Sequence, residues 1–206
     1  MHQFSDIDGT NDLYKGEFVI ISKLGSREMI KHGLGTINYL NGSVYEGMWV
    51  MGMREGYGRL IHPNGDMYEG DWMNDKANGQ GTFSNMQGYV YEGTWVDDCQ
   101  HGTGCERWES NNSKYEGTFE NSKKNGFGRY EWADGSYYEG TFADGVFDGE
   151  GTYFFADLQK TYIGQFKNAN MDGVGTEVWL DGKTFTGFYV LGRKQGEGTM
   201  TYPNKK

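Results

Sequence analysis

The stretch "NGDMYEGDW", residues 64–72, recurs along the chain, and this recurrence decides the fold. Nearly the same string appears as "DGSYYEGTF" at 134–142 and, more loosely, as "DGKTFTGFY" at 181–189. Its core is an aromatic–x–Gly–x–aromatic pattern, and eight copies begin at Tyr14, Tyr45, Tyr68, Tyr91, Tyr115, Tyr138, Tyr162 and Phe185. From Tyr45 onward, successive copies lie 23 or 24 residues apart. Self-similarity at this period predicts an array of repeats.

A pair of glycines separated by one residue follows each copy in constant phase, from Gly33/Gly35 to Gly196/Gly198. The first copy takes 19 residues to reach its glycine pair, whereas the second takes 11, so we predict an eight-residue insertion within residues 19–31. The extra residues of the 24-residue steps fall within 110–113 and 157–160. We expect these insertions in turns, because turns tolerate them and strand register does not. The predicted organisation is an N-terminal half unit or cap, residues 1–13, and a repeat array, residues 14–206.

Alternation within each copy predicts a strand. In "YEGTW" (91–95), the aromatic residues and the glycine alternate with polar residues, so the rings share one face and Glu92 lies on the other. A polar loop such as "VDDCQH" (96–101) then leads to a second strand that starts at the glycine pair, such as "GFGRYEW" (126–132). Pairs such as Asn64-Gly65 and Asp134-Gly135 follow, and they predict two-residue turns with positive φ at both positions. Each repeat is therefore predicted to be one β-hairpin.

The predicted fold is all-β. About eight stacked hairpins would form an elongated single-layer antiparallel sheet, curved or twisted into a rod with an aromatic groove. Two strands per repeat at about 4.8 Å give roughly 10 Å per repeat and a length on the order of 80 Å. One hairpin alone is barely stable, so stability would come from contacts between neighbours. Glycines in the strands leave room for neighbouring rings to cover the backbone.

Composition limits the classes of function. The 206 residues carry a net charge of −10, which argues against nucleic acid and anionic membrane surfaces as partners. No apolar run approaches the length of a membrane span, and residues 1–13 lack the basic and apolar regions of a secretory signal. Two cysteines form no disulfide framework and fit a reducing compartment. We therefore expect an intracellular protein, cytoplasmic or cytoskeletal.

The sequence offers few candidates for chemistry. One glutamate recurs in each central repeat, namely Glu46, Glu69, Glu92, Glu116 and Glu139. At roughly 10 Å spacing on an open face, these carboxylates lack a pocket that would separate their pKa values, so a solvated, strand-stabilising face is favoured over a hydrolase. Cys99, His101 and Cys105 lack a fourth ligand and match no zinc spacing. We predict no catalytic residue, metal or cofactor.

The pattern Y-E-G-x-W/F, loop, G-x-G, strand and turn resembles the MORN (membrane occupation and recognition nexus) repeat over about residues 14–202. "YEGMW", "YEGDW", "YEGTW" and two copies of "YEGTF" carry the resemblance, while Lys15, Ile163 and Thr186 replace the glutamate near the ends. The resemblance implies a curved antiparallel sheet with an aromatic groove. It also implies a protein-binding or self-associating platform in a larger assembly, such as the radial spoke of a ciliary axoneme or a cytoskeletal scaffold.

The open ring face is the predicted binding site. Most rings would hold neighbouring repeats together, but an exposed ring-lined face fits a helix or an extended peptide of a partner protein. The candidate protein-binding residues at mid-array are Tyr91, Trp95, Trp108, Tyr115, Phe119, Trp132, Tyr138 and Phe142. Open strand edges at the array ends also predict pairing with another chain, including a homodimer. The alternatives are a phospholipid-associated adaptor, disfavoured by net charge, and choline or carbohydrate binding, for which steady Trp-Tyr pairs are missing.

Overall fold

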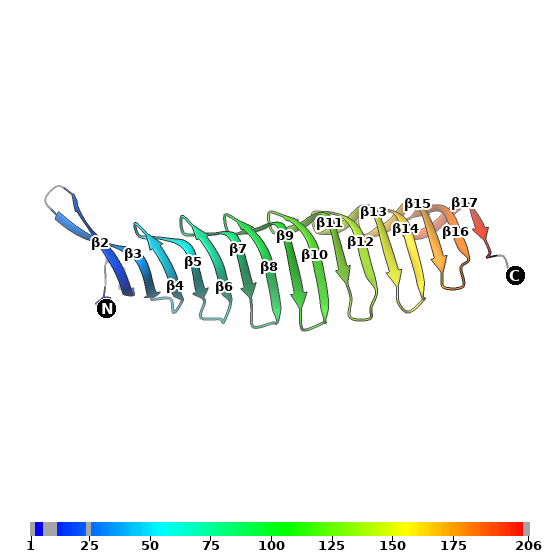
Figure 1. The fold of residues 1–206 in the computed structure, drawn as a ribbon. Coiled ribbons are helices and arrows are strands. Elements are labelled where there is room, and N and C mark those ends of the chain that lie inside the picture. Colours follow the sequence, from blue (N-terminus) through cyan, green and yellow to red (C-terminus); the bar gives the residue numbers. More distant parts are fainter. Residues whose placement is uncertain (1–2, 6–11, 24–25, 204–206) are drawn as a thin grey trace. The chain divides into compact units, whose positions relative to one another are not determined.

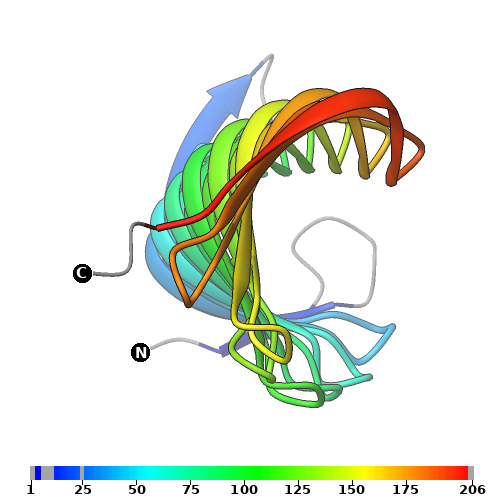
Figure 2. The same ribbon diagram turned by 90° about the vertical axis from the view of Figure 1, so that its right-hand side faces the viewer.

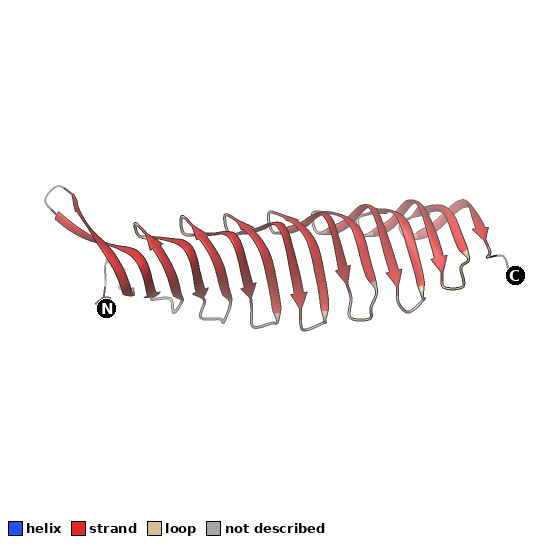
Figure 3. Cartoon of the chain, viewed as in Figure 1, coloured by secondary structure: helices blue, strands red, loops and turns tan. Residues whose placement is uncertain are grey.

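The computed structural model describes residues 3–5, 12–23 and 26–203, and these residues form strands and turns without a helix (Figure 3). The chain forms two compact units, residues 1–101 and 102–206. The strands of the first unit are β1 (Gln3–Ser5), β2 (Leu13–Lys23), β3 (Ser26–Asn38), β4 (Val44–Val50), β5 (Met53–Ile61), β6 (Met67–Met73), β7 (Lys76–Ser84), β8 (Tyr89–Val96) and the start of β9 (Cys99–Trp108). After β9, those of the second unit are β10 (Ser113–Glu120), β11 (Lys123–Glu131), β12 (Tyr137–Ala143), β13 (Val146–Phe155), β14 (Lys160–Lys167), β15 (Asn170–Trp179), β16 (Thr184–Val190) and β17 (Arg193–Thr201).

Consecutive strands pair with one another in both units (Figure 1). All of these pairs are antiparallel, from β1 to β8 in the first unit and from β9 to β17 in the second. Antiparallel neighbours joined by short turns are hairpins. The prediction of an all-β fold built from stacked hairpins is therefore confirmed.

Glycines of adjacent strands lie opposite one another and set the register. Gly58 is opposite both Gly47 of β4 and Gly70 of β6, and in the second unit Gly128 is opposite both Gly117 of β10 and Gly140 of β12. Next to this row the register shifts between Gly47 and Trp49, and again between Gly140 and Phe142. Such a shift is a β-bulge, which bends and twists the strand. The strands are accordingly bent rather than straight (Figure 2).

The predicted alternation of side chains is present in the strands. Along β4, the burial alternates so that Tyr45, Gly47 and Trp49 are buried while Glu46 is exposed. We call the side that carries the buried rings the ring face. The opposite side, which carries the repeat glutamates, is the glutamate face.

The turns after the first strand of each repeat are shorter than predicted. The expected polar loop at 96–101 is wrong, because β8 ends at Val96 and β9 begins at Cys99. Asp97 and Asp98 form the whole turn, with φ of 49° and 67°. Aspartate tolerates this left-handed conformation. The Oδ1 atom of Asp98 also accepts the backbone N–H of Ala77 at 2.8 Å, which ties the turn to the preceding hairpin.

The turns at the opposite end of each hairpin are longer than predicted. The expectation of positive φ at both Asn64 and Gly65 is wrong, because only Gly65 has it, at 87°. Five residues, 62–66, separate β5 from β6. The side-chain oxygen of Asn64 accepts the backbone N–H of Asp66 at 3.1 Å, and this local bond holds asparagine in the right-handed region. Asp134 makes the same bond to the N–H of Ser136 at 2.8 Å.

The first copy has longer strands than the others. β2 and β3 have 11 and 13 residues, against 7 and 9 in β4 and β5. The insertion within residues 19–31, expected in a turn, thus lengthens two paired strands, with Val19 opposite Ile30. Of the predicted cap, β1 pairs with Leu13–Lys15 of β2, while residues 1–2 and 6–11 lie outside the described residues. The boundary between cap and array stays a prediction.

Candidate protein-binding surface

The buried rings form one continuous series in each unit. Tyr138 contacts Phe142 of its own strand edge-to-face, with ring centroids 5.2 Å apart, and Phe166 of the next hairpin at 5.0 Å. In the first unit, Tyr68 contacts Trp72 and Trp95 in the same way, both at 5.1 Å. Edge-to-face contacts at these distances are favourable beyond the apolar area that they bury. We call this series the ring ladder.

Most polar atoms of the ring ladder have hydrogen-bond acceptors, and the buried hydroxyl group of Tyr189 is an exception. The hydroxyl group of Tyr138 donates to the carbonyl oxygen of Thr141, three residues on, at 2.9 Å, and the indole N–H of Trp95 donates to the carbonyl oxygen of Gly81 at 3.1 Å. Burial raises the pKa of the Tyr138 phenol to about 12. The ladder is therefore a buried core in which most polar groups are hydrogen-bonded.

The structure divides the eight predicted binding residues into two sets. Six belong to the ring ladder and are buried, with relative exposures from 0% to 8%: Tyr91, Trp95, Tyr115, Phe119, Tyr138 and Phe142. The other two, Trp108 and Trp132, are half-buried. The predicted binding role of all eight stays a prediction, but only Trp108 and Trp132 offer appreciable side-chain surface.

Trp108 and Trp132 belong to a second series of rings in the second unit. The ring centroids of Trp108 and Tyr130 are 5.7 Å apart, those of Tyr130 and Trp132 are 4.7 Å apart, and Trp132 continues to Tyr153 at 5.2 Å. Tyr153 and Phe155 follow at 4.4 Å. All five rings are half-buried. We call these five residues the ring row.

Sequence reasoning did not select Tyr130, Tyr153 and Phe155 as binding residues. A signal was available for Phe155 alone, because an aromatic residue stands four positions after the glycine pair in every repeat of the second unit: Trp108, Trp132, Phe155, Trp179 and Tyr202. The corresponding positions of the first unit hold Tyr39, His62 and Asn85. The continuous row is thus a property of the second unit.

Phe147 connects the ring row to the ladder beneath it. It stacks on Tyr138 with centroids 4.1 Å apart and meets the edge of Trp132 at 5.9 Å. The ammonium group of Lys124 lies 4.9 Å from the centroid of Trp108 and 5.0 Å from that of Tyr115. These contacts fix the half-buried rings on a rigid base.

Two buried carboxylates lie within the ring face and are paired with lysines. Lys160 and Lys194 place their Nζ atoms 2.7 and 2.6 Å from the carboxylate oxygens of Glu177. Burial alone would raise the pKa of this carboxyl, but the two lysines hold it below its usual range. Glu106 is paired with Lys124 in the same manner. A charge this buried requires such a partner.

Exposed carboxylates accompany the ring row along the turns. An exposed acid follows within two residues of three rings of the row and of Trp179, which lies outside the row. The rings are Trp108, Trp132, Phe155 and Trp179, and the acids are Glu109, Asp134, Asp157 and Asp181. Burial, and then the charges of Asp134 and Asp157, raise the pKa of Tyr153. The first unit has Asn41, Asn64 and Gln87 at the corresponding positions.

The recurring glutamates have side-chain partners on the glutamate face. Arg129 bonds Glu139 at 2.8 Å, and the Tyr57 hydroxyl group donates to Glu69 at 2.8 Å. Glu46 lies 3.5 Å from Arg59, and Glu116 lies 2.7 Å from Lys114. These pairs across and along strands fit the predicted strand-stabilising role.

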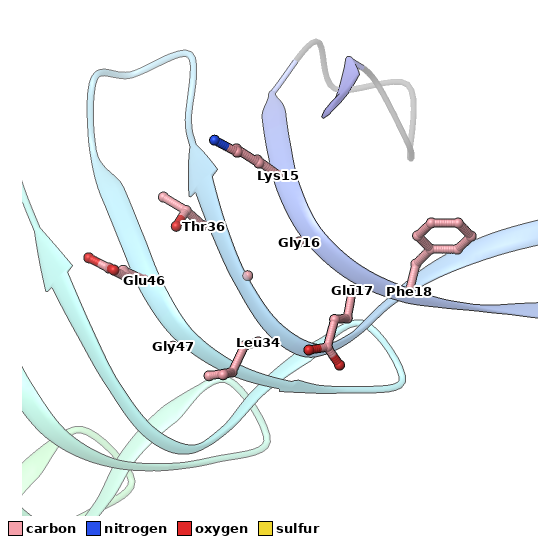
Figure 4. Close-up of a pocket in the computed structure, with 9 residues that line it drawn as sticks. Lys15, Gly16, Glu17, Phe18, Leu34, Thr36, Glu46 and Gly47 are labelled. Carbon is pink, nitrogen blue, oxygen red and sulfur yellow. The ribbon is translucent and has the colours of Figure 1, made fainter. Parts of the chain in front are cut away.

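A hollow of about 870 Å³ lies on the glutamate face of the first unit (Figure 4). Its lining combines the backbone of Gly16, Gly35 and Gly47 with the side chains of Lys15, Glu17, Phe18, Leu34, Thr36 and Glu46. In Figure 4 the labelled side chains come from β2, β3 and β4. The hollow is shallow and open, and the glycines leave its floor without side chains.

The remaining candidates for chemistry are isolated. Cys99 and Cys105 are free thiols. Across residues 3–5, 12–23 and 26–203, no three His, Cys, Asp or Glu side chains gather as metal ligands would. The same residues contain no helix with the length and apolar character that a membrane span requires.

Comparison with known proteins identifies the repeats. The family model of the MORN repeat matches residues 45–67, 68–85, 91–113, 115–137, 138–159, 162–184 and 185–206. No curated protein matches the chain. Among solved structures, the chain is similar to the SAS-4 (dCPAP) TCP domain of Drosophila melanogaster, in complex with a proline-rich motif of Ana2 (dSTIL), at 13% identity and a TM-score of 0.47 over 90% of this chain and 95% of that one. It is also similar to the TCP10 domain of Danio rerio CPAP in complex with a STIL peptide, at 11% identity and a TM-score of 0.28 over 84% of each chain.

Proposed function

The chain belongs to the MORN repeat family, and from this premise we propose that it is a non-enzymatic scaffold or adaptor. Its second unit binds a segment of a partner protein along the ring row. The observation that carries the proposal is the row itself: five half-buried rings in contact, on a base of buried rings. Aromatic residues on a rigid base are the commonest energetic centres of protein interfaces.

The eight predicted residues take different parts in this proposal. Trp108 and Trp132 contact the partner directly. The six ladder residues act beneath them by holding the row in place, since Phe147 and Lys124 bridge the two series. A loss of binding after substitution of a ladder residue would therefore reflect loss of fold.

We place this role in an intracellular assembly of the ciliary or cytoskeletal kind. Support for the placement comes from membership of the MORN family and is an analogy at the level of the fold. Pairing of an array end with another chain, including a second copy, forms part of the same proposal, because open strand edges seek partners.

The test is recovery of a partner from native cell extract with tagged wild-type protein and with a Trp108→Ala/Trp132→Ala double variant. A partner recovered in stoichiometric amount should fall at least about tenfold with the variant, since two central rings are removed. The matched control is Phe127→Ala/Val174→Ala, which removes two side chains, 60% and 56% exposed, from the opposite face of the same unit. A differently tagged second copy in the extract reports self-association in the same experiment.

Folding of both variants is checked by circular dichroism before recovery is compared. Equal recovery by wild type and the folded ring-row variant would refute the ring row as the binding site. Loss in the control variant alone would move the site to the glutamate face.

A further inference from the structure

We propose that the ring row binds a basic, proline-rich segment in the polyproline II conformation, with one turn of the segment on each hairpin. This inference rests on the proposed function and names the chemistry of the partner. The structural basis is that the spacing of equivalent rings along the hairpin stack is close to the length of one turn of a polyproline II helix.

The hairpin stack of the second unit repeats its rings at a spacing that a polyproline II helix matches. Each hairpin has two strands about 4.8 Å apart, so equivalent rings such as Trp108, Trp132 and Phe155 recur about every 10 Å. The contacts along the row agree, because Trp132 reaches Phe155 by two steps of 5.2 and 4.4 Å. A polyproline II helix advances about 3.1 Å per residue and about 9.3 Å per turn of three residues. A proline at every third position would therefore meet one ring per hairpin.

The shape of the row favours the polyproline II conformation over an extended β-strand and over an α-helix. An extended β-strand repeats its side chains about every 6.7 Å, which does not fit the ring spacing. An α-helix advances about 10.5 Å in seven residues, which fits, but it needs a wide apolar groove for its face. The row is a single file of aromatic rings, and aromatic-lined surfaces of this kind suit proline.

Charge along the row determines the sign of the segment. The exposed carboxylates Glu109, Asp134, Asp157 and Asp181 recur once per hairpin, within two residues of a ring in the sequence. Three lysines of the same face pair with its two buried glutamates, which leaves one net positive charge against the four exposed carboxylates. With a net charge of −10 for the chain, the surface complements arginine or lysine. Both features, ring and carboxylate, share the hairpin period, so proline and a basic residue should recur together in each triplet.

The experiment measures binding of synthetic peptides to the full chain by fluorescence anisotropy. The probe is a twelve-residue labelled peptide of four Pro-Ala-Arg triplets. Three comparison peptides alter one property each: Pro-Ala-Ala-Arg quartets change the period, Pro-Ala-Glu triplets reverse the charge, and Ala-Ala-Arg triplets remove proline and favour a helix. We expect the triplet probe to bind at least about tenfold more tightly than each comparison peptide.

Two protein variants locate the site. Trp132→Ala should weaken binding of the probe by about tenfold or more, while Phe127→Ala on the opposite face should leave it unchanged. An Asp134→Asn/Asp157→Asn variant removes charge but keeps the side-chain oxygen that the turn uses at Asp134, as Asn64 does in the first unit. It should weaken binding by about fivefold at low salt and by less at high salt. This variant keeps the test valid if Trp132→Ala fails to fold.

Equal affinity for the quartet, acidic or proline-free peptides would overturn the inference, as would no binding of the probe or loss of binding through Phe127→Ala alone. Failure of this inference is distinct from failure of the proposed function. A partner from native extract that is lost with Trp108→Ala/Trp132→Ala, while none of the peptides binds, would leave the ring row as a binding surface and remove only the proline-rich ligand.

Discussion

The first tyrosine of a repeat lies over two glycines, and this contact explains why those glycines recur. A Cβ atom added to Gly128 would lie 2.4 Å from the Tyr115 hydroxyl oxygen, and one added to Gly117 would lie 2.4 Å from the same atom. No real Cβ contact is that short. Because Tyr115 is fully buried and its hydroxyl group is bonded to Thr118, the ring cannot move aside without losing packing and a hydrogen bond.

Substitution of Gly128 by alanine should therefore destabilise the second unit. Overpacking of a filled core costs typically about 1–3 kcal/mol, and we expect a loss in this range from urea unfolding followed by tryptophan fluorescence. The control is a double-mutant cycle with Tyr115→Leu, which removes the clashing ring atoms. Gly128→Ala should cost clearly less in that background. The same cost in both backgrounds would show that the ring is not the cause.

Individual side chains also show what could be predicted from the sequence. Alternation in "YEGTW" predicts that Tyr91 and Trp95 share a face, and strand periodicity alone is sufficient for that. Their near-complete burial could not be predicted, because it depends on contacts that form only in the fold. Trp95 meets the ring of Tyr91 in its own strand and the ring of Tyr68 in the preceding hairpin. Trp108 and Trp132 were identified by position. Tyr130 was not, since its place beside Tyr115 follows only from the observed register.

The turns between strands were predicted in their existence but not in their form. The sequence predicts a turn at both ends of each hairpin. It predicts the two-residue turns at pairs such as Asn64-Gly65, whereas the structure has them at the other end, as at Asp97-Asp98. Side-chain bonds decide the outcome: Asn64 bonds its own turn, whereas Asp98 bonds the neighbouring hairpin. Local bonds of this kind compete with standard turn preferences and are visible only in three dimensions.

Hairpins joined through buried tyrosines should be sensitive to alkaline pH. Burial raises the pKa of Tyr14, Tyr138 and Tyr162 to about 12, and it raises those of Tyr45, Tyr68, Tyr115 and Tyr189 further. Unfolded tyrosine ionises near pH 10. Below pH 10 the phenols are neutral in both states and their contribution to stability is complete. As the pH rises from 10 towards 12, only the unfolded chain releases protons, so the free energy of unfolding should fall.

Urea midpoints measured between pH 9 and pH 12 test this expectation. A Tyr138→Phe variant should be less stable at neutral pH by about 1 kcal/mol, because it lacks the hydrogen bond to Thr141. It should also show a shallower decline with rising pH, because one ionisable phenol is gone. Midpoints that stay constant from pH 10 to pH 12 would contradict the buried, neutral state of the ladder.

The chain as a whole depends on contacts between consecutive hairpins rather than on one central core. Within each unit, a ladder tyrosine such as Tyr138 or Tyr68 touches a ring of its own strand and a ring of the next hairpin. A structure of this type should tolerate the removal of one complete repeat, because the flanking hairpins present equivalent surfaces to each other. Residues 138–161 are such a repeat, and their removal would place Tyr162 directly after Tyr137.

We expect the chain without residues 138–161 to fold and to unfold in urea with a denaturant slope lower by roughly one eighth, since that slope scales with the surface exposed on unfolding. In the shortened chain, Tyr115 should meet Phe166 in place of Phe142. The matched control removes residues 138–149 alone, which deletes one strand and leaves the next running in the wrong direction for its neighbour. Antiparallel register and the shared ring face then cannot both be kept, so the second unit should lose cooperative unfolding. If the complete-repeat deletion is as damaging as the half-repeat deletion, stability resides in specific long-range contacts instead, and the hairpin is not the unit from which this protein is built.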